Sequence, residues 1–204
     1  MYGVCSIHDT ARIDMVNALQ MRGDFLMTIQ EQFKLLTKFF ERENLDYAII
    51  GAFAIYAYGY TRATSDIDFI TRIEYQKRII EYLESLGFET LNRSDGFSNH
   101  LHPLGSMRID LVYIGDETAD IVFNSTKKKL VLEHFELPVV SPEHLIALKL
   151  FAIQNDPGRK FKELADIKEI VHLTDIDMDT IQLFFKKYGL ERYYNEIAGE
   201  KLIA

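Results

Sequence analysis

The sequence has little of what disulfide-stabilised, secreted and membrane-spanning proteins need. Its 204 residues include one cysteine, Cys5, which excludes an internal disulfide framework and is typical of a reducing compartment. The longest uncharged apolar stretch, residues 47–60, is too short to cross a bilayer and contains two glycines. The first thirty residues mix acidic and basic side chains among apolar ones, so no secretory signal is apparent. We therefore expect a cytoplasmic protein with no membrane partner.

Two further absences narrow the function. The sequence contains no Gly-x-x-x-x-Gly-Lys-Ser/Thr loop, which argues against a P-loop ATPase. The net charge of −8 argues against broad nonspecific nucleic-acid binding, because that binding depends on neutralising phosphates, although a local basic patch could still bind a specific RNA. Hydrophobic residues make up 48% of the chain, which is enough to form a buried core.

The most informative feature is the pair Asp66 and Asp68 in the run Thr64-Ser65-Asp66-Ile67-Asp68-Phe69. On a strand, alternate side chains point to the same face, so the two carboxylates lie together on one side. Two neighbouring anions repel each other unless a cation lies between them. Hard divalent cations such as Mg2+ prefer carboxylate oxygens and are often held together with substrate phosphates. Solvated surface turns also contain Asp-x-Asp, so the flanking sequence is needed to distinguish a metal site from such a turn.

The flanking segments favour a phosphate-binding site. Residues 47–50 are typical of a short buried strand, which Gly51-Ala52 interrupts before a short apolar helix. A strand, a small-residue turn and a helix N-terminus present free backbone N–H groups to a phosphate. Arg62 and Thr64 follow on the approach to the aspartates.

A third aspartate, Asp110, lies in the apolar strand expected at 107–114, on the same face as Val112 and Ile114. A charge in that position is costly unless something neutralises it, although an edge position at the strand start would also explain it. Three aspartates on two strands, beside a glycine turn, suit a two-metal phosphoryl or nucleotidyl transfer site.

The periodicity predicts a mixed α/β region followed by helices. Amphipathic helices are expected at 28–44 and 74–86, and strands near 88–91, 97–101, 107–114, 130–132 and 137–140. Beyond Ser141 the pattern predicts helices at 142–154, 161–173, 178–187 and 190–198. The lysines at 127–129 are expected in a solvated loop. We expect an N-terminal arm at 1–26, a core at 27–140 and a C-terminal helical region at 141–204.

The ordered motifs resemble the nucleotidyltransferase superfamily of the DNA polymerase β type, and more narrowly its AbiEii-like toxin branch. The resemblance rests on the following stretches: 50–54, Gly59, Arg62, Thr64, Asp66-Ile67-Asp68, the strand with Asp110, 141–150 and 160–167. It implies an α+β fold, with a nucleotidyltransferase-type mixed sheet flanked by helices and a C-terminal helical bundle. It also implies a Mg2+-dependent enzyme that transfers an NMP from an NTP.

The resemblance assigns roles to individual residues. Asp66, Asp68 and Asp110 would be metal ligands and catalytic residues, and Lys149 would also be catalytic. Nucleotide binding would involve Gly51, Ala52, Arg62, Thr64, Ser65, Lys149 and Asp166. The sequence departs from the family pattern at Ala52, which replaces a Gly or Ser, at Lys160, which replaces an Arg, and at Glu163, which replaces a frequent Asp. Ala52 removes a hydroxyl contact to phosphate but leaves backbone contacts available.

Lys149 and Asp166 also have plainer interpretations. Lys149 falls within an apolar helical stripe, where a lysine commonly extends its charged end to solvent. Asp166 could pair with Lys162 one helical turn earlier. The resemblance instead implies a lysine that reaches the triphosphate and a carboxylate that orients either the lysine or the nucleotide.

The resemblance allows three classes of acceptor for the transferred NMP: a tRNA 3′ end, a protein side chain or a small molecule. A toxin role would imply a cognate antitoxin. A nucleotide- or protein-binding module that kept the fold and lost turnover is an alternative, supported by Ala52. An antibiotic-modifying transferase is another.

Overall fold

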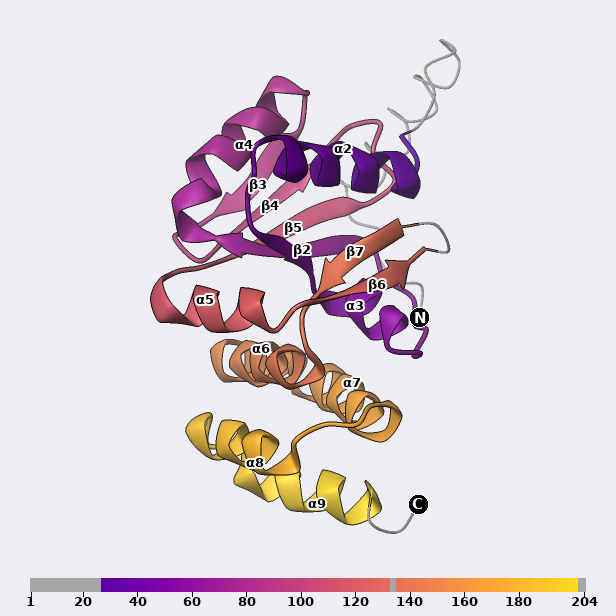
Figure 1. The fold of residues 1–204 in the computed structure, drawn as a ribbon, viewed down its shortest axis with the longest axis vertical. Helices are drawn as coiled ribbons and strands as arrows, with labels where there is room; N and C mark the ends of the chain where they lie inside the picture. Colours follow the sequence, from indigo (N-terminus) through magenta and orange to yellow (C-terminus); the bar gives the residue numbers. More distant parts are fainter. Residues whose placement is uncertain (1–26, 133–134, 202–204) are drawn as a thin grey trace, which may run out of the picture. The chain divides into compact units, whose positions relative to one another are not determined.

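The structure is a computed structural model that describes residues 27–132 and 135–201 (Figure 1). The expected arm at 1–26 lies outside the described residues. The described chain forms two compact units that alternate along the sequence. Unit 1 comprises the described residues up to 47 together with 65–115, and unit 2 comprises 48–64 together with the described residues from 116 onward. The expected division at 26 and 140 stays a prediction.

Unit 1 contains a mixed four-stranded arrangement in the order β3-β4-β5-β2. Its strands are β2 (Asp66–Arg72), β3 (Glu89–Arg93), β4 (Phe97–Leu101) and β5 (Arg108–Ile114). β2 and β5 are parallel, whereas β4 is antiparallel to both β3 and β5. The two strands with the predicted aspartates are therefore direct neighbours.

Helix α2 (Ile29–Arg42) covers the apolar side of β2, and α4 (Gln76–Ser85) packs against α2. Helix α2 begins with a capping box between Thr28 and Glu31, and a 3-10 turn (Ile73–Tyr75) leads into α4. Three aromatic contacts fix the packing: the rings of Phe33 and Phe40 lie 5.8 Å and 5.6 Å from that of Phe69 on β2, and Phe39 stacks on Tyr82 at 3.8 Å. The aromatic residues therefore bury one face of β2 and leave the aspartates on the other.

Gln32 joins α2 to the start of β5. Its side chain is fully buried, and its amide nitrogen donates to the Met107 carbonyl at 2.7 Å. Its amide oxygen accepts from the Met107 N–H at 3.0 Å and from the Ser106 hydroxyl at 2.9 Å. Both hydrogen-bonding groups of the amide are satisfied, as a buried polar side chain requires.

Unit 2 contains three short strands: β1 (Tyr47–Ile49), whose first residue belongs to unit 1, β6 (Lys127–Val131) and β7 (Phe135–Val139). β1 is parallel to β7, with Ile49 opposite Val139, and β6 is antiparallel to β7. The lysines at 127–129 lie on β6, so the prediction of a loop there was wrong. Lysine is a common residue on a strand at the edge of a sheet, where its charge deters pairing with another chain.

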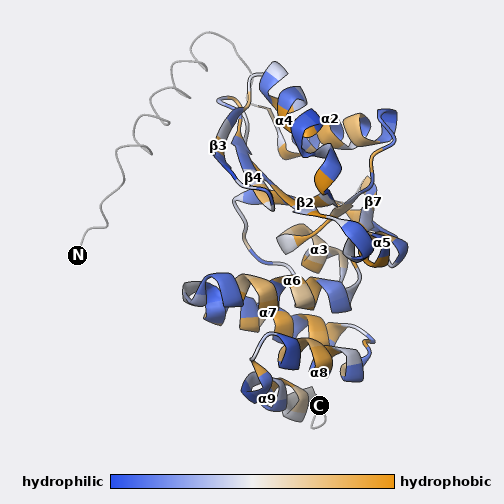
Figure 2. Cartoon of the chain, turned by 90° about the vertical axis from the view of Figure 1, so that its left-hand side faces the viewer, coloured by the Kyte–Doolittle hydropathy of each residue, from blue (hydrophilic) through white to orange (hydrophobic). Residues whose placement is uncertain are grey.

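Helices make up the rest of unit 2: α3 (Gly51–Ala57), α5 (Asp116–Asn124), α6 (Pro142–Asn155), a 3-10 turn (Pro157–Arg159), α7 (Lys160–Leu173), α8 (Met178–Lys187) and α9 (Glu191–Lys201). The four predicted C-terminal helices are confirmed. Hydrophobic segments run along α6, α7 and α8 (Figure 2), and their buried members include Leu150, Ile167, Ile170, Ile181 and Phe185.

The expected fold class, α+β with a mixed sheet and a C-terminal helical bundle, is confirmed by these elements. Helix α5 is an addition, because the periodicity did not predict it. Across the described residues, none of the helices has the length and apolarity that crossing a membrane demands.

Candidate active-site residues

Three aspartates and one arginine share one face of β2 and β5 in unit 1. The two strands are in register, with Asp66 opposite Arg108 and Asp68 opposite Asp110. The intervening positions of both strands are buried, whereas these four side chains are only partly buried. The alternation of strand side chains therefore brings the predicted carboxylates together on the face opposite the aromatic packing.

Arg108 binds two of these carboxylates. Its Nε and Nη2 atoms lie 2.6 Å from the two carboxylate oxygens of Asp110, and Nη2 also lies 2.9 Å from Oδ2 of Asp66. The hydrogen bonds to Asp110 raise the pKa of Arg108 above its ordinary value against partial burial, and the charges of Asp110, Asp66 and Asp68 add to this increase. We call this face of β2 and β5, with Asp66, Asp68 and Asp110, the acidic face. Its positive charge comes from Arg108, a residue of the chain itself.

The donor set suits a hard divalent cation, since it consists of carboxylate oxygens. Arg108 shows that Asp66 and Asp110 are close enough to share one positive group. Within residues 27–132 and 135–201, no three His, Cys, Asp or Glu side chains converge closely enough to hold a metal ion. The face therefore has the type of donor atom that the expected magnesium site needs, but its three carboxylates do not converge, and a guanidinium group lies between two of them.

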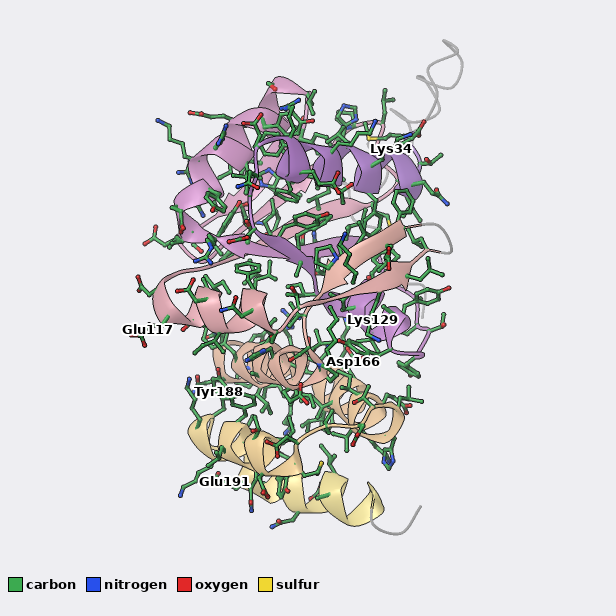
Figure 3. The ribbon with its side chains drawn as sticks, in the orientation of Figure 1. Lys34, Glu117, Lys129, Asp166, Tyr188 and Glu191 are labelled. Atoms are coloured by element: carbon green, nitrogen blue, oxygen red, sulfur yellow. The ribbon has the colours of Figure 1, made fainter. Side chains whose placement is uncertain are left out.

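Lys149 is the centre of a buried charge cluster in unit 2. Its Nζ atom lies 2.7 Å from Oε2 of Glu163 and 2.5 Å from Oδ2 of Asp166, and each of the three side chains is at most 7% exposed. Glu163 and Asp166 are three residues apart on α7, a spacing that places them on the same helix face toward α6. Asp166 is labelled in Figure 3.

Two arginines complete this cluster. Arg62 contacts both oxygens of Asp166, at 2.9 Å and 3.0 Å, and Arg159 contacts Oε1 of Glu163 at 2.6 Å and 3.1 Å. We call these five residues, Arg62, Lys149, Arg159, Glu163 and Asp166, the buried charge cluster. Three cations face two carboxylates, so the cluster has a formal charge of +1 if all five residues are ionised.

The cluster keeps Glu163 ionised. Burial by itself would raise the pKa of Glu163, but the charge of Lys149 and the hydrogen bonds from Lys149 and Arg159 outweigh it, so the pKa is lowered. Lys149 is 6% exposed, so its charged end is held by the two carboxylates rather than extended to solvent.

The remaining predicted nucleotide-binding residues lie next to helix and strand starts. Gly51 opens α3 with a φ of 63°, a left-handed conformation that favours glycine, and Ala52 is buried behind it. Thr64 ends the first segment of unit 2. Ser65 begins the second segment of unit 1, where its carbonyl accepts from the Arg108 backbone N–H at 3.2 Å.

A family model described as "Nucleotidyl transferase AbiEii toxin, Type IV TA system" matches residues 34–203. The chain belongs to this AbiEii family. It is therefore a nucleotidyltransferase, as the resemblance predicted. No curated protein matches the sequence.

Solved structures share the fold of this AbiEii chain. The solution structure of the antibiotic-resistance factor ANT(2'')-Ia has a TM-score of 0.60 at 16% identity, over 84% of this chain and 98% of its own. The crystal structure of ANT(2'')-Ia with adenylyl-2''-tobramycin has a TM-score of 0.59 at 19% identity, over 79% and 95%. The lincomycin-bound lincosamide adenylyltransferase LnuA has a TM-score of 0.50 at 16% identity, over 72% and 99%. At these identities the likeness establishes the fold.

Three residues of this AbiEii chain belong to these clusters although the sequence predicted no role for them: Arg108, Arg159 and Glu163. Arg108 precedes Asp110 by two residues, so strand alternation could have placed it on the acidic face. Glu163 follows Arg159 by four residues, a spacing that predicts a helical ion pair. The buried contact of Glu163 with Lys149 joins two different helices, and local spacing carries no signal for it.

Proposed function

We propose that this AbiEii-family enzyme transfers an NMP from an NTP to an acceptor hydroxyl with Mg2+ as cofactor. The observation that carries the proposal is the registered pairing of β2 and β5, which puts Asp66, Asp68 and Asp110 on one face. Nucleotidyl transfer needs a group of carboxylates of this kind beside the reacting phosphate.

The acidic face would hold the metal through Asp66, Asp68 and Asp110. When bound, the ion supplies positive charge that stabilises the phosphate oxygens. Asp110 accepts the proton of the acceptor hydroxyl. The hydroxyl oxygen forms a bond to the α-phosphorus, the bond between that phosphorus and the bridging oxygen breaks, and pyrophosphate leaves.

According to the family resemblance, the residues that would bind the nucleotide are Gly51, Ala52, Arg62, Thr64, Ser65, Lys149 and Asp166. In this proposal Gly51 and Ala52 contribute backbone N–H groups to the phosphates. Lys149 and Arg62 neutralise charge that develops on the leaving pyrophosphate, and Asp166 orients both of them. The contacts of Asp166 with Lys149 and Arg62 support its orienting role.

The family description names a toxin of a toxin–antitoxin system, which supports a cognate antitoxin as partner. For a toxin we propose a cellular acceptor such as tRNA or a protein. A small-molecule acceptor is the second candidate, because two neighbours are named for antibiotics: ANT(2'')-Ia with adenylyl-2''-tobramycin and LnuA with lincomycin.

The decisive experiment incubates the full chain with Mg2+ and each NTP labelled at the α-phosphate, together with tRNA, total RNA, protein extract or aminoglycosides. Asp68→Asn should reduce label transfer about 100-fold or more, because it removes a charged metal ligand. The matched control is Asp95→Asn, which makes the same change at an exposed aspartate of unit 1 and should leave transfer unchanged.

Equal transfer by the wild type and Asp68→Asn would reject the metal assignment. Calorimetric binding of an NTP without label transfer to any acceptor would favour the catalytically silent module. Label transfer to an aminoglycoside rather than to RNA or protein would select the small-molecule function.

A further inference from the structure

Arg108 occupies the face where the proposed metal would bind. Its guanidinium spans Asp66 and Asp110, with three nitrogen–oxygen distances between 2.6 Å and 2.9 Å. Asp68 stands opposite Asp110 on the neighbouring strand, and its charge also acts on Arg108. The arginine is thus the cation that offsets the repulsion among the carboxylates on this face.

A guanidinium in this position and a divalent ion interfere with each other. Both oxygens of Asp110 already accept from Arg108, so an ion coordinated by Asp110 would lie within a few Å of the guanidinium carbon's positive charge. Two cations at such a distance repel each other. Full coordination of an ion by Asp110 therefore requires Arg108 to give up hydrogen bonds to Asp110.

Arg108 has the freedom to do this. Its side chain is 40% exposed, whereas those of Asp66 and Asp110 are 22% and 17% exposed. The arginine starts at the first residue of β5, where the strand begins, and its charged end can turn to solvent without breaking the strand. Exposed ion pairs contribute little to stability, so the exchange has a low cost.

We propose that Arg108 is a positioning residue that holds Asp66 and Asp110 together when no metal is bound and competes with the divalent cation for them. The proposal rests on the metal-dependent function proposed above. It assigns to Arg108 two effects of opposite sign: it stabilises the metal-free fold, and it weakens metal binding. A residue that merely supported the metal site would have effects of the same sign.

The test measures binding of Mn2+ alone to the full-length protein, from the loss of the electron paramagnetic resonance signal of free Mn2+. Arg108→Gln should bind Mn2+ about fivefold more tightly than the wild type, the gain expected from removing one partly exposed competing charge. The same variant without metal should melt at a lower temperature, and Mn2+ should raise its melting temperature more than that of the wild type.

Two further variants complete the experiment. Arg72→Gln removes a different arginine of unit 1, which pairs with Asp46, and should leave Mn2+ affinity unchanged. Arg108→Lys keeps the charge but loses the two-pronged contact, so its affinity should fall between those of the wild type and Arg108→Gln. It also provides a reading if Arg108→Gln fails to fold.

Unchanged or weaker Mn2+ binding by Arg108→Gln or Arg108→Lys would overturn the inference, as would an equal gain in Arg72→Gln. The proposed function is judged separately, by label transfer in the wild type and in Asp68→Asn. If the wild type transfers label and Arg108→Gln gains no affinity, only the role of Arg108 is wrong. If Asp68→Asn binds Mn2+ as the wild type does, the metal assignment itself fails.

Discussion

The acidic face of unit 1 and the buried charge cluster of unit 2 differ in how far their side chains are exposed to solvent. On the acidic face of unit 1, Arg108 holds two carboxylates and keeps 40% of its side chain exposed. In the buried charge cluster of unit 2, Lys149 holds two carboxylates with at most 7% of any of the three side chains exposed. The contacts have similar lengths, but the surroundings differ.

This difference decides what each group can do. An exposed pair can exchange one cation for another, because water solvates whichever partner leaves. A buried pair cannot lose a partner without leaving an uncompensated charge in a medium that solvates it poorly. We therefore expect the acidic face to respond to added ions, and the buried charge cluster to hold α6 and α7 in a fixed arrangement.

The largest expected effect is that of Lys149→Met, which keeps the side-chain volume and removes the charge. Breaking a buried ion pair costs about 3–5 kcal/mol, and we expect the lower end because Asp166 keeps Arg62 and Glu163 keeps Arg159. Urea unfolding of the wild type and of Lys149→Met measures the difference in their free energies of unfolding.

Lys162→Met is the matched control for this change, since Lys162 is an exposed lysine on α7. It should alter the free energy of unfolding by no more than about 0.5 kcal/mol. Similar losses in the two variants would show that burial does not distinguish Lys149.

His100 extends the comparison to a buried polar group of unit 1. It lies fully buried on β4, with Nε2 2.7 Å from the Ser98 hydroxyl and Nδ1 3.2 Å from that of Thr90. Burial lowers the pKa of His100 from 6.5 to about 4, against the charges of Glu84 and Asp110. Between pH 6.5 and 4 the unfolded chain therefore binds more protons at this residue than the folded chain does.

Stability should consequently fall as the pH falls from 6.5 toward 4, by an amount on the order of 3 kcal/mol from His100. Urea unfolding at intervals across this range gives the slope. In His100→Gln the contribution disappears, so its stability should depend less steeply on pH. Parallel curves for the two proteins would contradict the role of His100.

The smallest effect is expected at the solvent edge of the buried charge cluster. Arg159→Gln removes a side chain that is 52% exposed and leaves Glu163 paired with Lys149. The loss in the free energy of unfolding should be about 1 kcal/mol or less, and high salt should reduce it further. A loss as large as that of Lys149→Met would mean that exposure does not set the strength of these pairs.

Much of the fold could be predicted from the sequence, because the C-terminal helices are rich in apolar residues and two of them, α6 and α8, begin at capping residues. Ser141 caps α6 with Pro142 in its first turn, and the predicted ends of α7 and α8 agree with the structure within a residue. Helix α5 was missed because it is only nine residues long and follows closely on β5. The lysines of β6 were assigned to a loop because charge masks the alternation of an edge strand.

The candidate site, like the fold, could be predicted only in part from the sequence. Strand alternation predicted that Asp66 and Asp68 share a face, and the apolar strand around Asp110, together with the family resemblance, pointed to Asp110. Sequence spacing could not show that Lys149 is buried between Glu163 and Asp166, because that contact depends on how two helices pack. Nor could it show that Arg108 also contacts Asp66, since that contact depends on the register of β5 against β2.

The register of β5 against β2 makes the buried side chain of Gln32 important for the candidate site. Its amide gives to and takes from the same backbone unit, Met107, immediately before the strand that carries Arg108. A slip of β5 by a single residue would turn Arg108 and Asp110 inward to the aromatic side and send their apolar neighbours outward. A single buried side chain on α2 thus helps to fix the strand register that keeps Arg108 and Asp110 on the acidic face.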